Sequence, residues 1–157
     1  MIQWQWREFA QLSGADVYAI LALRSEIFVV EQKCIYLDID GIDLQAWHLL
    51  GWQEIDGKRC LVAYLRVLPQ GLKFAEMSLG RVVSSSVVRG TGVGRELLSQ
   101  SLTHIAEKFH AQAIRISAQL YLQQFYEGFG FHVCSSAYDE DGIAHIEMLR
   151  PGLSSFP

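Results

Sequence analysis

The apolar and polar residues of the chain repeat with two different periods. Alternation or short apolar runs, typical of strands, occur in seven segments: 2–6, 48–55, 59–68, 74–85, 113–118, 131–136 and 144–149. Apolar residues three and four apart, typical of amphipathic helices, recur over 17–28 and 92–109, and a shorter helix is expected over 121–130. This order predicts a mixed β-sheet covered by helices, in an α+β or three-layer α/β fold.

Small polar residues mark several of the joints between these elements. Ser13 precedes the first helical segment and can cap it. Asp56-Gly57 separates two strand segments, which predicts a hairpin turn. Gly130 ends the last helix, and residues 33–47 are rich in turn-forming residues, which predicts a loop.

Composition sets the broad class of the protein. Of 157 residues, 50% are hydrophobic and 19% are charged, which predicts one globular domain over 1–150 and a short tail over 151–157. A net charge of −4 offers no basic surface for nucleic acid. No signal peptide is recognisable, and no apolar run approaches the ~20 residues that span a membrane. The three cysteines fit no zinc spacing and no disulfide framework, so we expect reduced thiols, no metal and a cytoplasmic protein.

Three glycines stand where a strand gives way to the long helix. Gly90, Gly92 and Gly94 follow the strand segment 74–85. The first amides of a helix lack internal partners and carry a partial positive charge, so phosphate is their natural ligand. Glycine lets the backbone approach that ligand, and Arg89 adds a cation at the mouth.

Two familiar phosphate loops do not fit these glycines. The nucleotide-triphosphate P-loop needs Gly-Lys-Ser/Thr, but Arg95 and Glu96 follow Gly94. The dinucleotide fingerprint lies in the first βαβ unit with another spacing. A tight turn without a ligand is the other interpretation of these residues.

Two separated motifs resemble those of the GNAT N-acetyltransferases. Residues 89–94, RGTGVG, fit the family signature Gln/Arg-x-x-Gly-x-Gly/Ala, and "GRVV" precedes them on the strand. Downstream, "QLYLQQFYEGFGF" resembles the element Asn-x-x-Ala-x-x-x-Tyr-x-x-x-Gly-Phe of that family. The segments "RSEIFVVEQKCIYLDIDGIDLQAWHLLGW" and "YDEDGIAHIEM" resemble its ElaA-like branch, whose acceptor is uncertain. The resemblance implies acetyl-coenzyme A as co-substrate.

The resemblance also implies which residues hold the cofactor. In the family, the fourth and fifth strands splay apart at a bulge, and the pantetheine arm of the cofactor enters the gap. One backbone amide of the fourth strand polarises the thioester carbonyl, and the glycine turn holds the pyrophosphate. The cofactor residues implied are Val82, Val83, Ser84, Arg89, Gly90, Thr91, Gly92, Val93, Gly94, Gln119 and Phe125. Gln119 stands where many relatives have Asn, which lengthens the reach of that amide.

Tyr126 is the candidate general acid. An amine that attacks the thioester expels a thiolate; a thiol has a pKa near ~8.5 and a phenol near ~10, so Tyr126 can remain protonated and donate to the sulfur. The alternative is an aromatic core residue. Candidate bases are Glu76, Glu31 and His48, or water. Glu76 lies two residues, or ~6.6 Å, before the position of the base in histone acetyltransferases, and His48 is equally compatible with a structural role.

Two further features bear on the acceptor pocket. Asp38, Asp40 and Asp43 resemble a calcium loop but lack its closing Glu, so we expect a turn that shapes the acceptor pocket and gives it negative charge. His145 alternates with apolar residues, which favours a structural or pocket-lining role.

Two functions are compatible with the sequence. The first is acetyl transfer from acetyl-coenzyme A to an amine of a small molecule or peptide, by direct attack in a ternary complex and without a metal. The second is a regulatory or protein-interaction module that binds acyl-coenzyme A without turnover. Relatives are often dimers, but no residue here requires a second copy.

Overall fold

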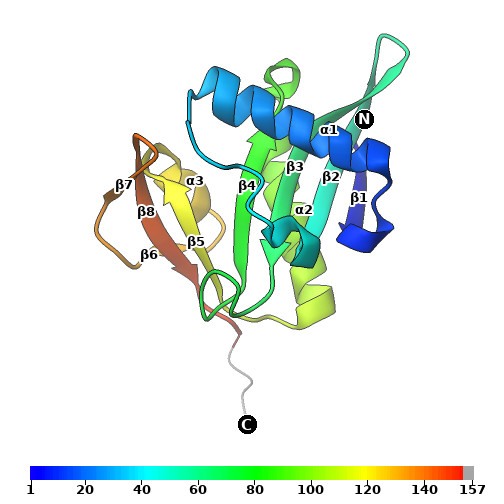
Figure 1. The fold of residues 1–157 in the computed structure, drawn as a ribbon. Coiled ribbons are helices and arrows are strands. Elements are labelled where there is room, and N and C mark those ends of the chain that lie inside the picture. The colour runs from blue at the N-terminus through cyan, green and yellow to red at the C-terminus, as the bar shows by residue number, and fades with distance from the viewer. Residues whose placement is uncertain (154–157) are drawn as a thin grey trace.

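The structure, a computed structural model, describes residues 1–153 as two antiparallel sheets that meet at one end of their facing edges and diverge from there (Figure 1). The first sheet has the order β1-β2-β3-β4, and its strands are β1 (Gln3–Glu8), β2 (Trp47–Ile55), β3 (Lys58–Leu68) and β4 (Ser78–Ser84). The second has the order β5-β8-β6, with β7 also paired to β8; its strands are β5 (Ile114–Gln119), β6 (His132–Val133), β7 (Tyr138–Glu140) and β8 (Ile143–Arg150). The mixed α/β architecture is confirmed, with eight strands in place of seven.

The two sheets touch only where β4 and β5 begin. A single parallel bridge joins Met77 to Ile114, and the N–H of Arg115 donates to the carbonyl of Met77 at 2.9 Å. Beyond this bridge no ladder pairs β4 with β5 in the described residues. The predicted splay between the fourth and fifth strands is therefore confirmed.

Helices cover the first sheet on both faces. Helix α1 (Gly14–Arg24) crosses its front in Figure 1 and continues as a π-helix over Ser25–Glu31, while α2 (Val93–Phe109) lies behind it. Helix α3 (Gln123–Glu127) packs beside the second sheet. Short 3-10 turns occupy Phe9–Gln11, Ile42–Gln45, Ser86–Val88 and Leu120–Leu122.

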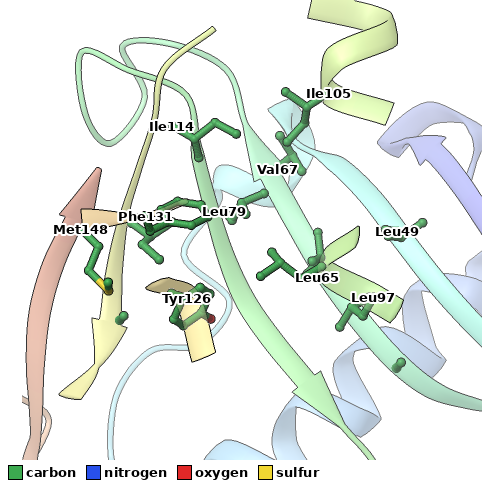
Figure 2. Close-up of a cluster of buried hydrophobic side chains, with 14 of the residues drawn as sticks. Leu49, Leu65, Val67, Leu79, Leu97, Ile105, Ile114, Tyr126, Phe131 and Met148 are labelled. Atoms are coloured by element: carbon green, nitrogen blue, oxygen red, sulfur yellow. The ribbon is translucent and has the colours of Figure 1, made fainter. Parts of the chain in front are cut away.

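The central strands have continuous apolar sequences because both of their faces are buried, and strand β3 is an example. Tyr64 points to the α1 side and packs with Ile20 and Leu23, whereas Leu65 points to the α2 side and packs with Leu97. Tyr64 and Leu65 are both fully buried. Figure 2 shows the cluster on the α2 side, which continues through Tyr126 and Phe131 to the second sheet. A strand buried on both faces has no polar side to alternate with.

The helix cap at Ser13 and the hairpin turn at Asp56-Gly57 are both present, as predicted from the sequence. Ser13 caps α1: its hydroxyl accepts from the N–H of Asp16 at 3.1 Å, and the Asp16 carboxylate accepts from the N–H of Ser13 at 2.9 Å. Asp56 and Gly57 have φ of 50° and 73°, the positive values that a two-residue hairpin turn of type I′ requires.

Other boundaries differ from the prediction. The strand predicted over 74–85 begins only at Ser78, so Glu76 precedes it, and the strand predicted over 131–136 is reduced to His132–Val133. β7 was not predicted; it forms because the turn at Asp141-Gly142, with φ of 53° and 81°, folds it back on β8. Of the predicted tail 151–157, residues 154–157 lie outside the described residues.

Candidate active-site cleft

A cavity of about 420 Å³ occupies the gap between β4 and β5. We call it the splay cleft. Leu79, Gly80 and Val82 line it from β4, and residues 116–119 line it from β5. Tyr126 lines it from α3. Seven of these positions belong to the two strands that diverge, so the cleft is a direct consequence of the splay.

A bulge in β4 accompanies the splay. Tyr64 pairs with Val83 and Arg66 with Gly80, so two steps along β3 face three along β4. Arg81, inside the bulge, has φ of 52°, which is strained for a residue with a side chain. Its guanidinium holds this conformation by donating to Asp38 Oδ1 at 2.7 Å and to the Asp38 carbonyl at 3.1 Å. A bulge leaves one residue unpaired and bends the strand, which opens the backbone of β4 toward the cleft.

The glycine turn forms an open cradle at the start of α2. Gly90 and Gly92 have φ of 76° and 87°, and a Cβ on either would meet no atom within 4 Å. Gly92 is the N-cap, and the first amide of α2 that bonds back to it is that of Glu96, at 3.1 Å. Among the described residues, the N–H groups of Gly92, Val93 and Gly94 have no acceptor. Unpartnered amides beside empty space fit a diphosphate.

Arg89, which the sequence predicts as a cation at the mouth of the cradle, forms an ion pair with Glu31 in the structure. Its guanidinium forms a two-point ion pair with Glu31, with Nη2 at 2.8 Å from Oε2, and Nη2 also lies 3.3 Å from the carbonyl of Ser84. The bond from Arg89 lowers the pKa of Glu31. Arg89 and Glu31 thus tie the end of the π-helix to the turn, and neither lines the splay cleft.

Tyr126 lies between the two sheets with its ring held by other aromatic residues (Figure 2). Phe125 and Phe131 meet it edge-on, at centroid distances of 5.2 Å and 5.8 Å. Its hydroxyl has no hydrogen-bond partner among the described residues. It is nevertheless accessible to solvent, because the only side-chain polar atoms there that are both fully buried and unpartnered are Trp52 Nε1 and Arg66 Nε. The hydroxyl therefore opens onto the cleft that the ring lines. Burial raises the pKa of Tyr126, so the phenol is protonated at neutral pH.

The remaining cofactor candidates are distributed around the cleft and the cradle. Phe125 has its Cζ 4.0 Å from where a Cβ of Gly94 would stand, so it supports the cradle. Gln119 lines the cleft and donates to Gln32 Oε1 at 3.1 Å. The side chains of Val83 and Val93 belong to the core, and Thr91 donates to the carbonyl of Val88 at 2.6 Å. For Val83, Thr91 and Val93 the side chain is already occupied, so only the backbone is available to a ligand.

The structure places two candidate bases away from the cleft. Glu76 precedes β4 and forms an ion pair with Arg115, Oε2 to Nε at 3.1 Å, which lowers the pKa of Glu76. His48 is 1% exposed; its Nε2 donates to the Asp43 carbonyl at 3.0 Å, and its Nδ1 accepts from the Tyr64 hydroxyl at 2.7 Å. Burial lowers the pKa of His48. His48 thus has the structural role that the sequence left open.

The acidic loop is neutralised, contrary to the expectation that it would give the pocket negative charge. Its three aspartates meet three arginines from α1, β3 and β4 in a network that we call the Asp–Arg network: Asp38, Asp40, Asp43, Arg24, Arg66 and Arg81. Arg24 is fully buried and bridges Asp38 and Asp43, both at 2.9 Å. Sequence reasoning missed these arginines, because each sits in an apolar segment and its partner is 14 or more residues away.

Comparison with known proteins identifies the family. Residues 54–150, more than half of the chain, match the family described as acetyltransferase (GNAT) domain. The chain belongs to the GNAT acetyltransferase family. Protein ElaA of Escherichia coli K12 is 41% identical over 152 residues, 96% of this chain and 97% of that protein. A UPF0039 protein of Synechocystis is 41% identical over 148 residues, 94% of either chain. The predicted ElaA-like membership is thereby confirmed.

Solved structures place this GNAT protein in the same group. An acyl-CoA N-acyltransferase from Pseudomonas aeruginosa has a TM-score of 0.88 at 40% identity, covering 96% of this chain and 99% of that one. The ElaA structure from Escherichia coli has a TM-score of 0.87 at 41% identity, with the same coverage. At 14% identity, the CoA-dependent synthase BjaI, solved with isopentyl-CoA, shares the fold alone, with a TM-score of 0.72 over 95% of this chain and 82% of that one.

Residues 1–153 show neither a membrane-spanning helix nor a metal-binding cluster. No helix there has the length and apolar character to cross a bilayer. No cluster of three or more His, Cys, Asp or Glu side chains there is arranged to hold a metal ion. The three cysteines are free thiols.

Proposed function

We propose that this GNAT protein transfers the acetyl group of acetyl-coenzyme A to an amine, by direct attack within a ternary complex. The observation that carries the proposal is the hydroxyl of Tyr126. It is unpartnered, it is protonated at neutral pH, and it opens onto the cleft between β4 and β5. Such a phenol can donate its proton to a leaving group without breaking a hydrogen bond that stabilises the fold.

The cradle and the edge of β4 fit the co-substrate. The free amides of Gly92, Val93 and Gly94 would hold its diphosphate, and residues 82–84 would pair with the pantetheine arm as an added strand. When bound, acetyl-coenzyme A supplies an activated carbonyl and a thiol leaving group. These contacts would be made by backbone groups, so the side chains of Val83 and Val93 can pack in the core at the same time.

The chain can act at two points of the acetyl transfer. A backbone amide exposed at the β4 bulge can donate to the carbonyl oxygen as negative charge develops there, a contribution typically of a few kcal/mol. Tyr126 can donate its proton toward the sulfur as negative charge develops on that atom. Burial, which raises the pKa of Tyr126, ensures that this proton is present throughout the neutral range.

The test is a Tyr126→Phe variant, with Tyr121→Phe as its matched control. Both remove one hydroxyl from a tyrosine that lines the splay cleft. Thiol release from acetyl-coenzyme A is measured over a panel of primary amines, and calorimetry measures coenzyme A binding. We expect Tyr126→Phe to lower turnover by roughly 10²–10⁴-fold at unchanged coenzyme A affinity, and Tyr121→Phe to have a much smaller effect.

Two results would contradict the proposal in different ways. Unchanged turnover in Tyr126→Phe would remove the general acid but leave acetyl transfer. A wild-type protein that binds coenzyme A yet releases no thiol with any amine would favour the regulatory module instead.

A further inference from the structure

The splay cleft has two unlike sides. Leu65 belongs to the core on the α2 side of β3, and neighbouring side chains of a strand point to opposite faces, so Arg66 points to the α1 side, where it meets Asp40. Tyr126 belongs to the core on the α2 side, and the glycine cradle begins α2. We therefore expect the co-substrate on the α2 side of the cleft and the acceptor on the α1 side.

The cations that line the cleft differ in whether they have a partner. Arg66 donates to both oxygens of Asp40, at 2.8 Å and 2.6 Å, and Arg81 lies 3.3 Å from Asp40 Oδ2. Lys73 lines the same cleft. Among residues 1–153, no hydrogen bond or ion pair joins its ammonium to another residue. Lys73 is thus the cation of the cleft whose hydrogen-bond donors are free.

Two carboxylates act on Lys73 through their charge, and each has another partner. Glu140 Oε2 lies 3.2 Å from Nε2 of His145, which also lines the cleft. Glu147 Oε2 lies 3.1 Å from Arg115 Nη1. Neither carboxylate forms an ion pair with Lys73. The cleft therefore presents a free cation as well as the negative charge of Glu140, and an amine alone would leave that cation unmatched.

Lys73 lies in the loop between β3 and β4, and contacts within the protein hold this loop. The N–H of Gly71 donates to the carbonyl of Phe74 at 2.8 Å, which closes a turn around Lys73. The centroid of the Phe74 ring is 5.3 Å from Lys73 Nζ and 5.7 Å from Arg115 Cζ. Arg115 is fixed in turn by its ion pair with Glu76, at 3.1 Å. A structured turn therefore presents the ammonium to the cleft.

The surroundings of Lys73 favour a bound anion. Lys73 is an exposed residue overall, but protein atoms around its ammonium replace part of the water, which lowers the pKa of Lys73. Glu140 raises that pKa, whereas Arg81 and Arg66 lower it. An ordinary lysine pKa is near ~10.4, so the group is charged at neutral pH. A carboxylate in contact stabilises the charged form, which the surroundings alone disfavour.

The phosphates of the co-substrate lie too far away to be this anion. Lys73 precedes β4, and the glycine cradle follows it. The seven residues of β4 span ~23 Å as a strand. The cations whose charge acts on Lys73, Arg66 and Arg81, meet the aspartates of the loop on the α1 side. An anion at Lys73 is therefore expected on the acceptor side of the cleft.

We propose that Lys73 binds a carboxylate of the acceptor. The inference rests on the proposed acetyl transfer, and it narrows the acceptor to amines that also carry a carboxylate, as amino acids do. The carboxylate accepts hydrogen bonds from the Lys73 ammonium and holds the acceptor on the α1 side of the cleft. An amine without a carboxylate lacks this contact and leaves Lys73 unpaired.

The experiment compares Lys73→Met with Lys58→Met. Both substitutions keep an unbranched side chain and remove one positive charge, but Lys58 is an exposed residue at the start of β3 that does not line the cleft. Each protein, saturated with coenzyme A, is titrated by calorimetry with phenylalanine, β-alanine, 4-aminobutyrate and 6-aminohexanoate. Each of these ligands is compared with its own carboxamide, which has the same size and no negative charge.

We expect at least one amino acid to bind the wild type about tenfold more tightly than its carboxamide, the effect of a hydrogen bond between charged groups. Lys73→Met should abolish this preference at unchanged coenzyme A affinity, and Lys58→Met should retain it. A wild-type protein that prefers none of the four carboxylates would overturn the site. Equal losses in the two variants would also overturn it, because they would indicate a diffuse positive field.

Thiol release distinguishes this inference from the function on which it rests. Amino-acid binding that depends on Lys73 without any thiol release would support the carboxylate site and refute acetyl transfer. Thiol release from acetyl-coenzyme A that Lys73→Met leaves unchanged with every amino acid would refute the site and leave acetyl transfer intact. Succinyl-coenzyme A tests the other source of a carboxylate. A loss in Lys73→Met that is confined to this donor would assign the carboxylate to the acyl group and overturn the acceptor site.

Discussion

The glycine cradle and the cluster of Ser117, Tyr138, Glu140 and His145, which we call the acceptor wall, are built in opposite ways. The cradle is a continuous run, residues 89–94, and it offers backbone amides beside empty space. The acceptor wall draws Ser117 from β5, Tyr138 and Glu140 from β7 and His145 from β8, and it offers side chains that bond to one another. A backbone site can be recognised in a single stretch of sequence, whereas a side-chain site exists only after the strands have paired.

The Asp–Arg network and the acceptor wall differ in a second respect, although both contain carboxylates at the cleft. In the network, three aspartates meet three arginines, so the charges cancel and the oxygens are occupied. In the wall, Glu140 Oε1 has no hydrogen-bond partner among residues 1–153. A carboxylate in a sequence therefore predicts negative potential only when its partners are known.

The largest effect is expected from breaking the network at its centre. Arg24→Met removes the fully buried arginine that bridges Asp38 and Asp43 and leaves them only Arg81 and Arg66, respectively. Removing one member of a buried ion pair typically lowers the free energy of unfolding by about 3–5 kcal/mol. Urea unfolding measures the loss. Arg7→Met, at an exposed arginine, is the control, with an expected change below about 0.5 kcal/mol. Similar losses in the two variants would show that the network adds nothing to stability.

A smaller, local effect is expected at the cradle. Gly92→Ala and Gly57→Ala each place a methyl group on a residue with positive φ, 87° and 73°, respectively. Neither methyl group meets another atom within 4 Å, so the two substitutions should destabilise the backbone to a similar extent. Of the two, only Gly92→Ala disturbs amides that we propose to hold the diphosphate. Calorimetry with coenzyme A should show about tenfold weaker binding for Gly92→Ala, and unchanged binding for Gly57→Ala. Equal affinities would mean that the turn does not hold phosphate.

The pH dependence of stability should reflect the Asp–Arg network. Burial alone would raise the pKa of Asp43, but hydrogen bonds from Arg24 and Arg66 outweigh it and lower that pKa; Asp40 behaves in the same way with Arg66. A depressed folded-state pKa contributes stability above the unfolded value, near ~3.9, and that contribution is lost as the pH falls further. Urea midpoints should therefore decline below about pH 4. Arg24→Met should flatten this decline, and an unaltered slope in that variant would separate the aspartates from acid sensitivity.

The smallest effect is expected at the exposed ion pair beside the cradle. Arg89 and Glu31 are 43% and 42% exposed, and ion pairs that water reaches contribute little to stability. Arg89→Met should lower the free energy of unfolding far less than Arg24→Met does, and high salt should remove most of the difference. A loss as large as that of Arg24→Met would show that exposure does not distinguish the two pairs.

The periodicity of the apolar residues and the positions of turn-forming residues were enough to predict the order of most elements. They also predicted the Ser13 cap, the hairpin at Asp56-Gly57 and the glycine turn before α2. Each depends on residues close together in sequence, where backbone conformation is decided locally. The length of β4, the extra strand β7 and the partners of Asp38 and Arg89 could not be predicted in this way.

The sequence by itself determined the family, the succession of strands and helices, and a backbone site that one short run can encode. Tertiary structure alone decided which charges cancel and which stay free, because Arg24, Arg66 and Arg81 reach the acidic loop from three separate elements. It also decided that Glu140 and His145 meet, through the pairing of β7 with β8. Electrostatic interactions depend on distance in space, and the folded chain sets that distance independently of separation along the sequence.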